Sequence, residues 1–265
     1  MYQFNYTRAG NRDEAVAAIV KAEDGKFLAG GMTLIPTLKQ RLASPSDLID
    51  LAELGGLIGI SDDGESITIG AMTTHAAVAA SDVVKSKIPA LAHLAGHIGD
   101  PAVRHRGTIG GSIANNDPAA DYPAGCVGLN ATIVTSKREL SADDFFTGMF
   151  DTALAEDELV TAVRFPVPAK AAYQKFPNPA SRYAIVGVMV AETGGETRVA
   201  VTGAGQGGVF RATEIEKALA GGWNADAAKA VKMSPNDLNA DIHASAEYRA
   251  HLISVMASRA VTAAS

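Results

Sequence analysis

Alternating apolar and polar residues predict a small βαβαβ unit at the start of the chain. Tyr2, Phe4 and Tyr6 alternate with polar residues, which is typical of a short strand. Asn11 precedes a run with carboxylates in its first turn and small apolar residues three and four positions apart, so we expect it to cap a helix. Further strands are expected at 26–29 and 48–51, with a Gly30-Gly31 turn and a helix at 32–42 between them.

A second block follows from about residue 54 and is expected to contain a hairpin, several short helices and further strands. The hairpin is indicated by two apolar runs, 58–60 and 66–70, on either side of an acidic turn containing Gly64. We expect helices at 74–80, 83–86, 88–96 and 122–127 and strands at 131–135 and 159–165. The segment from His97 to Pro118 is expected to be a long loop.

The sequence Pro166-Val167-Pro168 marks a stiff break, because proline lacks an amide donor and restricts the residue before it. Beyond it, strands are expected at 183–191 and 197–202, and helices at 213–219, 226–231 and 248–259. The pattern therefore predicts an α+β chain in three blocks, and the third block begins after this break.

Composition narrows the class of protein. The 265 residues are 47% hydrophobic and 20% charged, which is enough apolar material for a buried core. The net charge is −6 without a basic block, which argues against binding to nucleic acid. The longest apolar stretch, Tyr183 to Ala191, is far shorter than a membrane span, and the first residues lack the basic and apolar regions of a signal peptide. We therefore expect a cytoplasmic protein.

The cysteine count limits the metal chemistry of the chain. Cys126 is the only cysteine, so the chain cannot form an internal disulfide, a cysteine zinc cluster or an iron–sulfur centre alone. Any such cofactor must then lie on another chain. No nucleophile, base and orienting residue occur in a recognisable arrangement, so we assign no catalytic residue and no metal ligand.

Two segments with paired glycines are the strongest chemical signal. Gly30-Gly31 follows one expected strand, and Gly110-Gly111 lies in the sequence from Gly107 to Asp121. Paired glycines let successive backbone N–H groups point into one concavity, and a following helix adds partial positive charge, so together they suit a phosphate. Polar side chains after the second pair are suited to sugar hydroxyls. Either pair alone is best read as a tight turn; the two together indicate a nucleotide site.

Other motifs favour structural roles. The sequence 203–208 matches G-x-G-x-x-G, but no helix opens inside it and no second strand follows, so we interpret it as a turn at a strand end. His93 and His97 have zinc-helix spacing without the glutamate of such a motif, which favours packing or interface histidines over a zinc site. The cluster Arg104-His105-Arg106 has two open interpretations: contact with phosphates or contact with a partner subunit.

The two glycine segments and the Pro-Val-Pro break resemble the FAD-binding medium subunit of the molybdenum hydroxylases, the carbon monoxide dehydrogenase and xanthine dehydrogenase family. The resemblance covers nearly the whole chain. It implies an α+β protein of two domains. The first is a vanillyl-alcohol-oxidase-like (PCMH-type) FAD-binding domain over 1–170, with two α/β subdomains of about 1–53 and 54–170. The second is a carbon monoxide dehydrogenase flavoprotein C-terminal domain over 171–265. In that family the FAD pyrophosphate lies between the two glycine loops.

The resemblance also implies the residues that bind FAD. On the pyrophosphate and adenosine side they are Leu28, Ala29, Gly30, Gly31, Met32 and Thr33. Toward the other phosphate oxygens and the ribitol they are Thr108, Ile109, Gly110, Gly111 and Ser112, then Asn115, Asp117, Asp121, Leu159 and Lys175. Most relatives have asparagine where this chain has Ser112, which removes one side-chain contact and leaves the backbone contacts in place.

The function implied by the resemblance is electron transfer. A large subunit with the molybdenum cofactor oxidises the substrate, a small subunit with 2Fe-2S clusters relays electrons, and FAD on this chain passes them to an acceptor, in a dimer of heterotrimers. We expect non-covalent FAD, because neither glycine loop contains a His, Cys or Tyr. A self-contained flavin oxidoreductase and a scaffold subunit are the alternatives. The substrate (CO, a purine, an aldehyde or an N-heterocycle) and the acceptor stay open.

Overall fold

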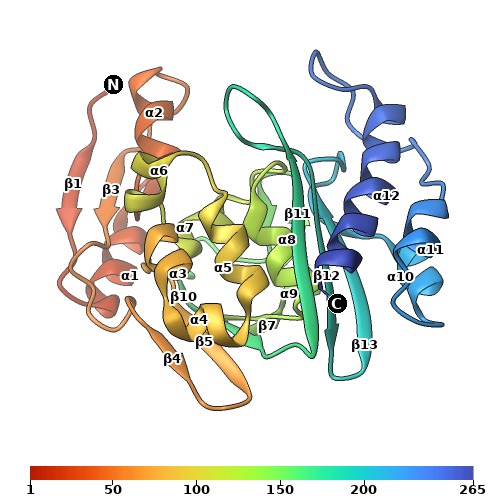
Figure 1. Cartoon of the computed structure of the whole chain (residues 1–265). Coiled ribbons are helices and arrows are strands. Elements are labelled where there is room, and N and C mark those ends of the chain that lie inside the picture. Colours follow the sequence, from red (N-terminus) through yellow and green to blue (C-terminus); the bar gives the residue numbers. More distant parts are fainter. Residues whose placement is uncertain (265) are drawn as a thin grey trace.

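The computed structural model describes residues 1–264, which form three main sheets arranged side by side in chain order (Figure 1). The first is a parallel sheet in the order β1-β3-β2, and it is the predicted βαβαβ unit. Its elements are β1 (Asn5–Arg8), α1 (Arg12–Lys21), β2 (Gly25–Leu28), α2 (Leu34–Lys39) and β3 (Asp47–Asp50).

The two helices of this unit differ in how well the sequence predicts their ends. The Asn11 side chain accepts a hydrogen bond from the Glu14 N–H, which confirms the predicted start of α1. Helix α2 is shorter than the predicted 32–42. Residues 29–33 stay outside the helix, and Arg41 has a left-handed φ of 60°, which ends it.

The second sheet is antiparallel, in the order β4-β5-β10-β6-β7, and its first two strands form the predicted hairpin. Its strands are β4 (Ile60–Asp62), β5 (Ser66–Gly70), β6 (Thr132–Thr135), β7 (Glu139–Ser141) and β10 (Val160–Pro166). Helices α3 (His75–Ala80), α4 (Asp82–Lys87), α5 (Pro89–Gly96), α8 (Asp121–Gly128) and α9 (Ala142–Phe145) belong to the same block, as does a small hairpin of β8 (Phe146–Gly148) and β9 (Asp151–Thr152).

The expectation of a long loop from His97 to Pro118 is wrong. Two helices lie there, α6 (Pro101–Arg106) and α7 (Ile109–Asn115). The Asp100 side chain accepts from the Val103 N–H, and the Thr108 side chain accepts from the Gly111 N–H, so each helix has a capped start. Glycines disfavour a helix interior, which hides α7 in the sequence, but here the caps and the packing of the helix outweigh that preference.

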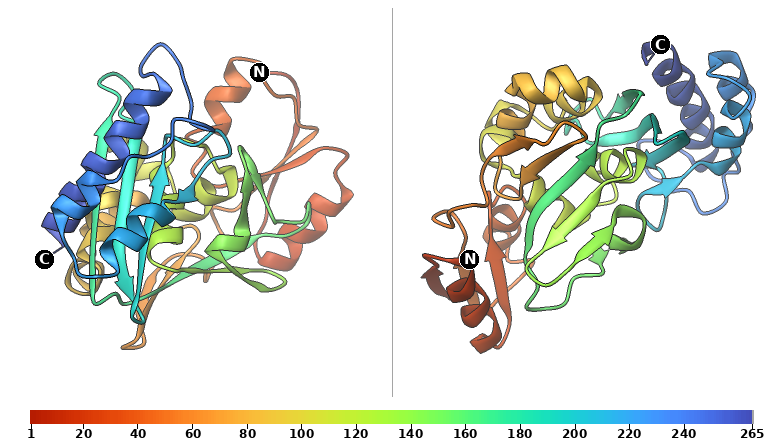
Figure 2. Two further views of the ribbon diagram at one scale, coloured as in Figure 1. Left: turned by 90° about the vertical axis from the view of Figure 1, so that its right-hand side faces the viewer. Right: turned by 90° about the horizontal axis from the view of Figure 1, so that it is seen from below.

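The third sheet is a four-stranded antiparallel meander, β11-β12-β13-β14, covered on one side by the last three helices (Figure 2). Its elements are β11 (Lys170–Pro177), β12 (Ala184–Thr193), β13 (Glu196–Thr202), β14 (Phe210–Arg211), α10 (Thr213–Leu219), α11 (Ala225–Ala230) and α12 (Ala246–Ala263). Strands β11 and β14 are not predicted by the sequence pattern. Helix α12 runs past the predicted end at residue 259 because its side chains continue to pack on the sheet up to Val261.

Strand β12 separates two hydrophobic cores. Met189 and Ala191 point to the core that holds the middle sheet and helices α5 and α8, whereas Val188 and Val190 point to the core beneath α12. Alternate residues of a strand face opposite sides, so the continuous apolar run predicted here is a strand buried on both faces. The α+β fold class is confirmed. Within residues 1–264, no helix is both long and apolar enough to cross a membrane.

Candidate functional site

The first glycine loop is residues 29–33, between β2 and α2. Gly31 has a φ of 71°, a left-handed conformation that favours glycine. Gly30 packs directly on the second glycine segment, because a Cβ placed on it would lie 2.0 Å from the carbonyl oxygen of Arg106. The two glycine segments, far apart in sequence, therefore touch.

The second glycine loop is residues 107–112, and its glycines occupy the first turn of α7 rather than a free loop. Gly110 lies against β5, where a Cβ would be 2.5 Å from that of Ala71. Gly111 is less enclosed: a Cβ there would lie 3.0 Å from Thr108 Oγ1 and 3.4 Å from Ala29 Cβ. A positive φ is found at Gly31 and not at Gly30, Gly110 or Gly111. Close approach, not backbone conformation, explains Gly30 and Gly110.

The two loops differ in the backbone donors that they offer. Among the described residues, none accepts a hydrogen bond from the backbone N–H groups of residues 30–34. In the second loop most backbone donors are paired: Ile109 N donates to Thr73 O, Gly110 N to Ala71 O, and Gly111 N to Thr108 Oγ1. Thr108 N has no acceptor among the described residues. The free backbone donors therefore lie mainly in the first loop, and the second loop also presents its Thr108 and Ser112 hydroxyls.

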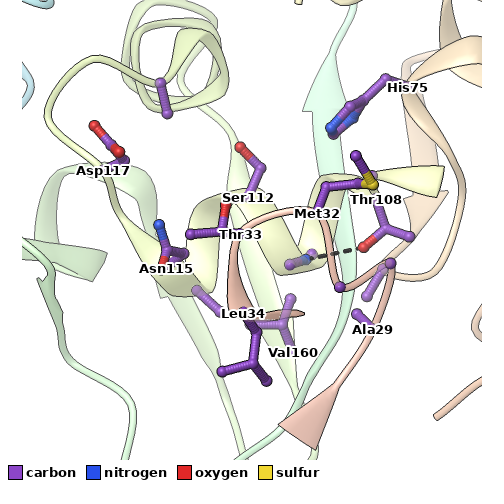
Figure 3. A pocket seen from close by; sticks show the side chains of 18 of the residues that line it. Ala29, Met32, Thr33, Leu34, His75, Thr108, Ser112, Asn115, Asp117 and Val160 are labelled. Carbon is purple, nitrogen blue, oxygen red and sulfur yellow. Dashed lines mark hydrogen bonds between the residues drawn. The ribbon is translucent and has the colours of Figure 1, made fainter. Parts of the chain in front are cut away.

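A cavity of about 440 Å³ lies between the two loops, within the size range of ligand pockets, roughly 300–1,000 Å³ (Figure 3). Most of the expected FAD-binding residues line it: Ala29, Gly30, Gly31, Met32, Thr33, Thr108, Gly110, Gly111, Ser112, Asn115, Asp117, Asp121 and Leu159. Figure 3 shows Asn115 and Asp117 toward one end and His75 and Thr108 toward the other. Burial raises the pKa of Asp117, which accepts from the Ala119 N–H.

Three of the expected residues do not line the cavity. Leu28 ends strand β2, and Ile109 is fully buried in the core of the second block. Lys175 lies on β11, where its Nζ is 2.9 Å from the Asp121 carboxylate and 3.1 Å from the carbonyl oxygen of His97. Lys175 therefore reaches the cavity only through Asp121, which does line it.

Asp121 and Lys175 form a buried joint between α8 of the second block and β11 of the third block. The Tyr173 hydroxyl also donates to Asp121, at 2.5 Å, and the side chains of Asp121 and Lys175 are only 4% and 5% exposed. Burial raises the pKa of Asp121, and the opposite charge of Lys175 counteracts this effect. The joint fixes one wall of the cavity to the third sheet.

Sequence reasoning missed further residues of the cavity wall because they are far from both loops in the sequence. His75 comes from the start of α3, Met72 follows β5, and Tyr183 precedes β12 in the third block. Tyr183 lies against Thr33 of the first loop, and burial raises its pKa. His75 and Tyr183 are polar aromatic residues in contact with the cavity that no local motif marks.

The remaining motifs take structural positions. Gly203 has a φ of 82° at the end of β13, and the next helix begins only at Thr213, which confirms a strand-end turn. The ring centroids of His93, on α5, and His97, its C-cap, lie 4.1 Å apart, with the ring planes tilted by 39°. None of Arg104, His105 and Arg106 lines the cavity, and the Arg104 guanidinium donates to the carbonyls of Ile98 and Gly99. Cys126 is fully buried in α8.

Comparison with known proteins explains this arrangement. A model described as "FAD binding domain in molybdopterin dehydrogenase" matches residues 2–168, and one described as "CO dehydrogenase flavoprotein C-terminal domain" matches residues 171–264. The chain belongs to the FAD-binding subunits of the molybdenum hydroxylases. The expected family and the expected oxidoreductase class are thus confirmed.

Individual members of the family match over almost their whole length. The nicotine 6-hydroxylase medium subunit of Paenarthrobacter nicotinovorans is 32% identical, with 98% of this chain and 96% of that protein covered. The carbon monoxide dehydrogenase medium chain of Hydrogenophaga pseudoflava is 34% identical, with 99% and 97% covered. A solved structure of carbon monoxide dehydrogenase from the same organism has a TM-score of 0.90 at 35% identity, covering 99% and 97% of the two chains.

The residues of the cavity fit the cofactor of this family. The free N–H groups of residues 30–34 are donors without acceptors, which is the complement of a pyrophosphate that only accepts. Ser112, Asn115 and Asp117 are polar groups suited to the hydroxyls of a sugar or ribitol chain. Leu159, Val160 and Met72 supply apolar surface for a flat ring system.

Proposed function

We propose that this chain is the electron-transferring flavoprotein subunit of a molybdenum hydroxylase complex in the cytoplasm. It receives electrons from 2Fe-2S clusters on a small partner subunit and delivers them to an external acceptor, while a large partner subunit holds the molybdenum cofactor, in a dimer of heterotrimers. The observation that carries the proposal is the cavity between the loops, with unpaired backbone donors on one side and polar side chains on the other.

Each part of the cavity has a separate task in this function. The backbone N–H groups of residues 30–34 hold the pyrophosphate, and α7 orients the sugar chain through Ser112 and Asn115. Tyr183 lies against Thr33 and covers the cavity from the third block, which limits the access of water. Bound FAD supplies a carrier that accepts electrons one at a time and can release two.

The chain's own residues support a supply of electrons from a partner. Its only thiol, Cys126, is enclosed in α8, where burial raises its pKa well above the ordinary value, so it is not a ligand for a cluster. The buried carboxylate of the cavity wall, Asp121, is held in place by Lys175 and Tyr173. The site thus binds and orients a cofactor, and no side chain in it is assigned as a general base.

The entry point of electrons tests the function. The small iron–sulfur subunit from the same genomic neighbourhood would be reduced, freed of excess reductant and mixed anaerobically with this chain loaded with FAD. We expect the visible flavin absorbance to bleach. The chain alone should not bleach with carbon monoxide, nicotine, glyceraldehyde or xanthine, the compounds that name its relatives. Bleaching of the lone chain by one of them would favour a self-contained oxidoreductase, and no transfer from the reduced partner would overturn the relay.

The attachment of the flavin is tested on the same preparation. We propose non-covalent binding, although His75 and Tyr183, residue types that can form flavin bonds, line the cavity. Acid precipitation of the complex should leave all flavin in the supernatant. Yellow colour in the washed pellet would show a covalent bond.

A further inference from the structure

His75 is a buried polar side chain in the cavity wall that the proposed function leaves without a task. It is the first residue of α3, after the cap Thr74, and its backbone N–H donates to the carbonyl oxygen of Gly107 at 3.0 Å. The residue is only 4% exposed, yet it lines the cavity. In Figure 3 its ring extends from α3 toward the space near Met32 and Thr108, one from each glycine loop.

The two ring nitrogens of His75 have different surroundings. Nδ1 is enclosed and has no hydrogen-bond partner among residues 1–264. Nε2 faces Gly107, where a Cβ would lie only 2.6 Å away, so any side chain at position 107 would displace the ring. Gly107 also lines the cavity. Gly107, which precedes Gly110 and Gly111 in the second loop, therefore leaves room for the His75 ring at the cavity wall.

The groups around His75 keep the ring neutral. Burial lowers its pKa to about 4, and the positive charge of Arg104, on α6, acts in the same direction. On the other side the ring of Tyr122, from α8, lies 5.3 Å away between centroids, and its hydroxyl has no partner among the described residues. None of these neighbours is a carboxylate that would hold a proton on the imidazole.

A neutral imidazole carries its single proton on one of two nitrogens. An enclosed N–H without an acceptor costs more than an enclosed lone pair, so the proton belongs on Nε2 and not on the enclosed Nδ1. Nε2 is also the nitrogen on the side that Gly107 leaves open. His75 is then a hydrogen-bond donor at the cavity wall, held in one tautomer by its environment.

We propose that His75 is a direct binding residue for FAD, donating a hydrogen bond from Nε2 to an oxygen or nitrogen acceptor of the cofactor, and that Gly107 is required to seat its ring. FAD offers acceptors along its whole length, in the phosphates, the hydroxyls and the ring system, and a neutral donor serves them without adding charge. The inference rests on the proposed binding of FAD and assigns to it a residue outside both glycine loops.

Three substitutions at one position test the donor. Each purified variant would be stripped of flavin and titrated with FAD, with binding followed by quenching of flavin fluorescence. His75→Leu fills the space without a donor and should bind about tenfold more weakly, the loss of about one hydrogen bond. His75→Gln, whose amide nitrogen reaches the position of Nε2, should stay within about threefold of the parent chain. His75→Asn is too short and should resemble His75→Leu.

Two further variants separate binding from folding. His251→Gln, on the exposed side of α12, should leave FAD affinity unchanged. Gly107→Ala should weaken FAD binding as His75→Leu does, because the added methyl displaces the ring. Equal affinity in the parent chain, His75→Leu and Gly107→Ala would overturn the inference and leave the proposed function intact. A parent chain that does not bind FAD would overturn both.

The tautomer gives a readout that a merely structural role would not move. Nitrogen NMR of histidine-labelled chain, with the His75 signals assigned by their absence in His75→Gln, should show the proton on Nε2 before FAD is added. Addition of FAD should shift the Nε2 signal, as expected for a new hydrogen bond, and leave Nδ1 unprotonated. A proton on Nδ1, or signals that do not respond to FAD, would refute direct binding.

Discussion

The glycines of the two loops have different reasons to be glycine. Gly30 and Gly110 lack room for a Cβ, because Arg106 O and Ala71 stand where it would be. Gly31 has a left-handed backbone. Gly111 alone has moderate space around its missing side chain, and it lines the cavity. A larger residue at Gly111 therefore acts mainly on what the cavity can hold.

This difference predicts the behaviour of Gly111→Val. The added Cβ lies 3.0 Å from Thr108 Oγ1 and 3.4 Å from Ala29 Cβ, and both of these residues line the cavity, so a branched side chain takes up room between the two loops. We expect a folded chain that has lost most of its FAD, measured as the ratio of flavin to protein absorbance after purification. Gly207→Val is the matched control, because no atom lies within 4 Å of a Cβ at that position. Normal flavin content in Gly111→Val would show that this face of α7 does not contact the cofactor.

His75 also predicts a dependence of stability on pH. Its pKa is about 4 in the folded chain and 6.5 in the unfolded chain, so below pH 6.5 the unfolded state binds the proton first. The stabilising contribution is complete above pH 6.5 and is lost between pH 6.5 and 4. The difference amounts to roughly 3 kcal/mol of unfolding free energy.

Denaturant unfolding of the flavin-free chain at pH 7.5 and 4.5 measures this difference in unfolding free energy. His75→Gln should lose less stability than the parent chain over that interval, because glutamine does not titrate. His251→Gln, exposed on α12, should lose as much unfolding free energy between the two pH values as the parent chain does. An equal loss of unfolding free energy in the parent chain and in His75→Gln would contradict a buried neutral histidine.

At the residue scale, the sequence reveals the loops better than the wall behind them. Paired glycines and the following polar residues lie within single short segments, so their pattern can be seen without a fold. His75 and Tyr183 reach the cavity from α3 and from the start of β12, and nothing in their local sequence differs from an ordinary helix or strand end. Only the packing of three blocks brings them to the loops.

At the level of elements, the joint between α8 and β11 connects the second and third blocks. Asp121 on α8 meets Tyr173 and Lys175 on β11, and all three side chains are enclosed. A buried charge that loses its partner is costly, whereas a pair replaced as a whole is not. The joint therefore depends on the two charges being present together.

Lys175→Met predicts a large loss of stability. It leaves the Asp121 carboxylate buried beside Tyr173 without its cation, which should cost about 3–5 kcal/mol of unfolding free energy. The double variant Asp121→Asn with Lys175→Met should recover at least half of that loss. Denaturant unfolding of the single and double variants measures the coupling. A loss below about 1 kcal/mol in Lys175→Met would mean that water reaches the carboxylate.

The elements that the sequence failed to predict share a physical cause. Helix α7 contains two glycines in its first turn, so its local preference opposes a helix, and the contacts of Gly110 with Ala71 decide the outcome. Strand β11 mixes lysine, alanine, tyrosine and glutamine without clear alternation, and it is fixed by pairing along most of β12. In both cases, contacts distant in sequence determine the structure.

At the scale of the whole molecule, the family resemblance supplied what periodicity did not. The hydrophobic pattern indicates an α+β chain with a break near Pro166, but it does not show that the first and second blocks enclose a common cavity. The two glycine segments carry that information, since their contact at Gly30 and Arg106 joins sequences more than seventy residues apart. Recognising the two segments as one site therefore predicts that the first two blocks meet at a common cavity.

The position of β12 has a consequence for how the chain unfolds. Because Met189 and Val190 belong to different cores on opposite faces of one strand, neither core can open without exposing the other. The second and third blocks should therefore melt in one concerted thermal transition rather than in two. The three-stranded unit at the N-terminus contributes residues to neither of these two cores and packs in a third core, which it shares with Met72 and Leu159 of the second block. This unit can therefore open while the two larger cores stay closed, but only by exposing those two side chains. The first glycine loop, which lies in this unit, would lose its hold on the pyrophosphate in that partial opening.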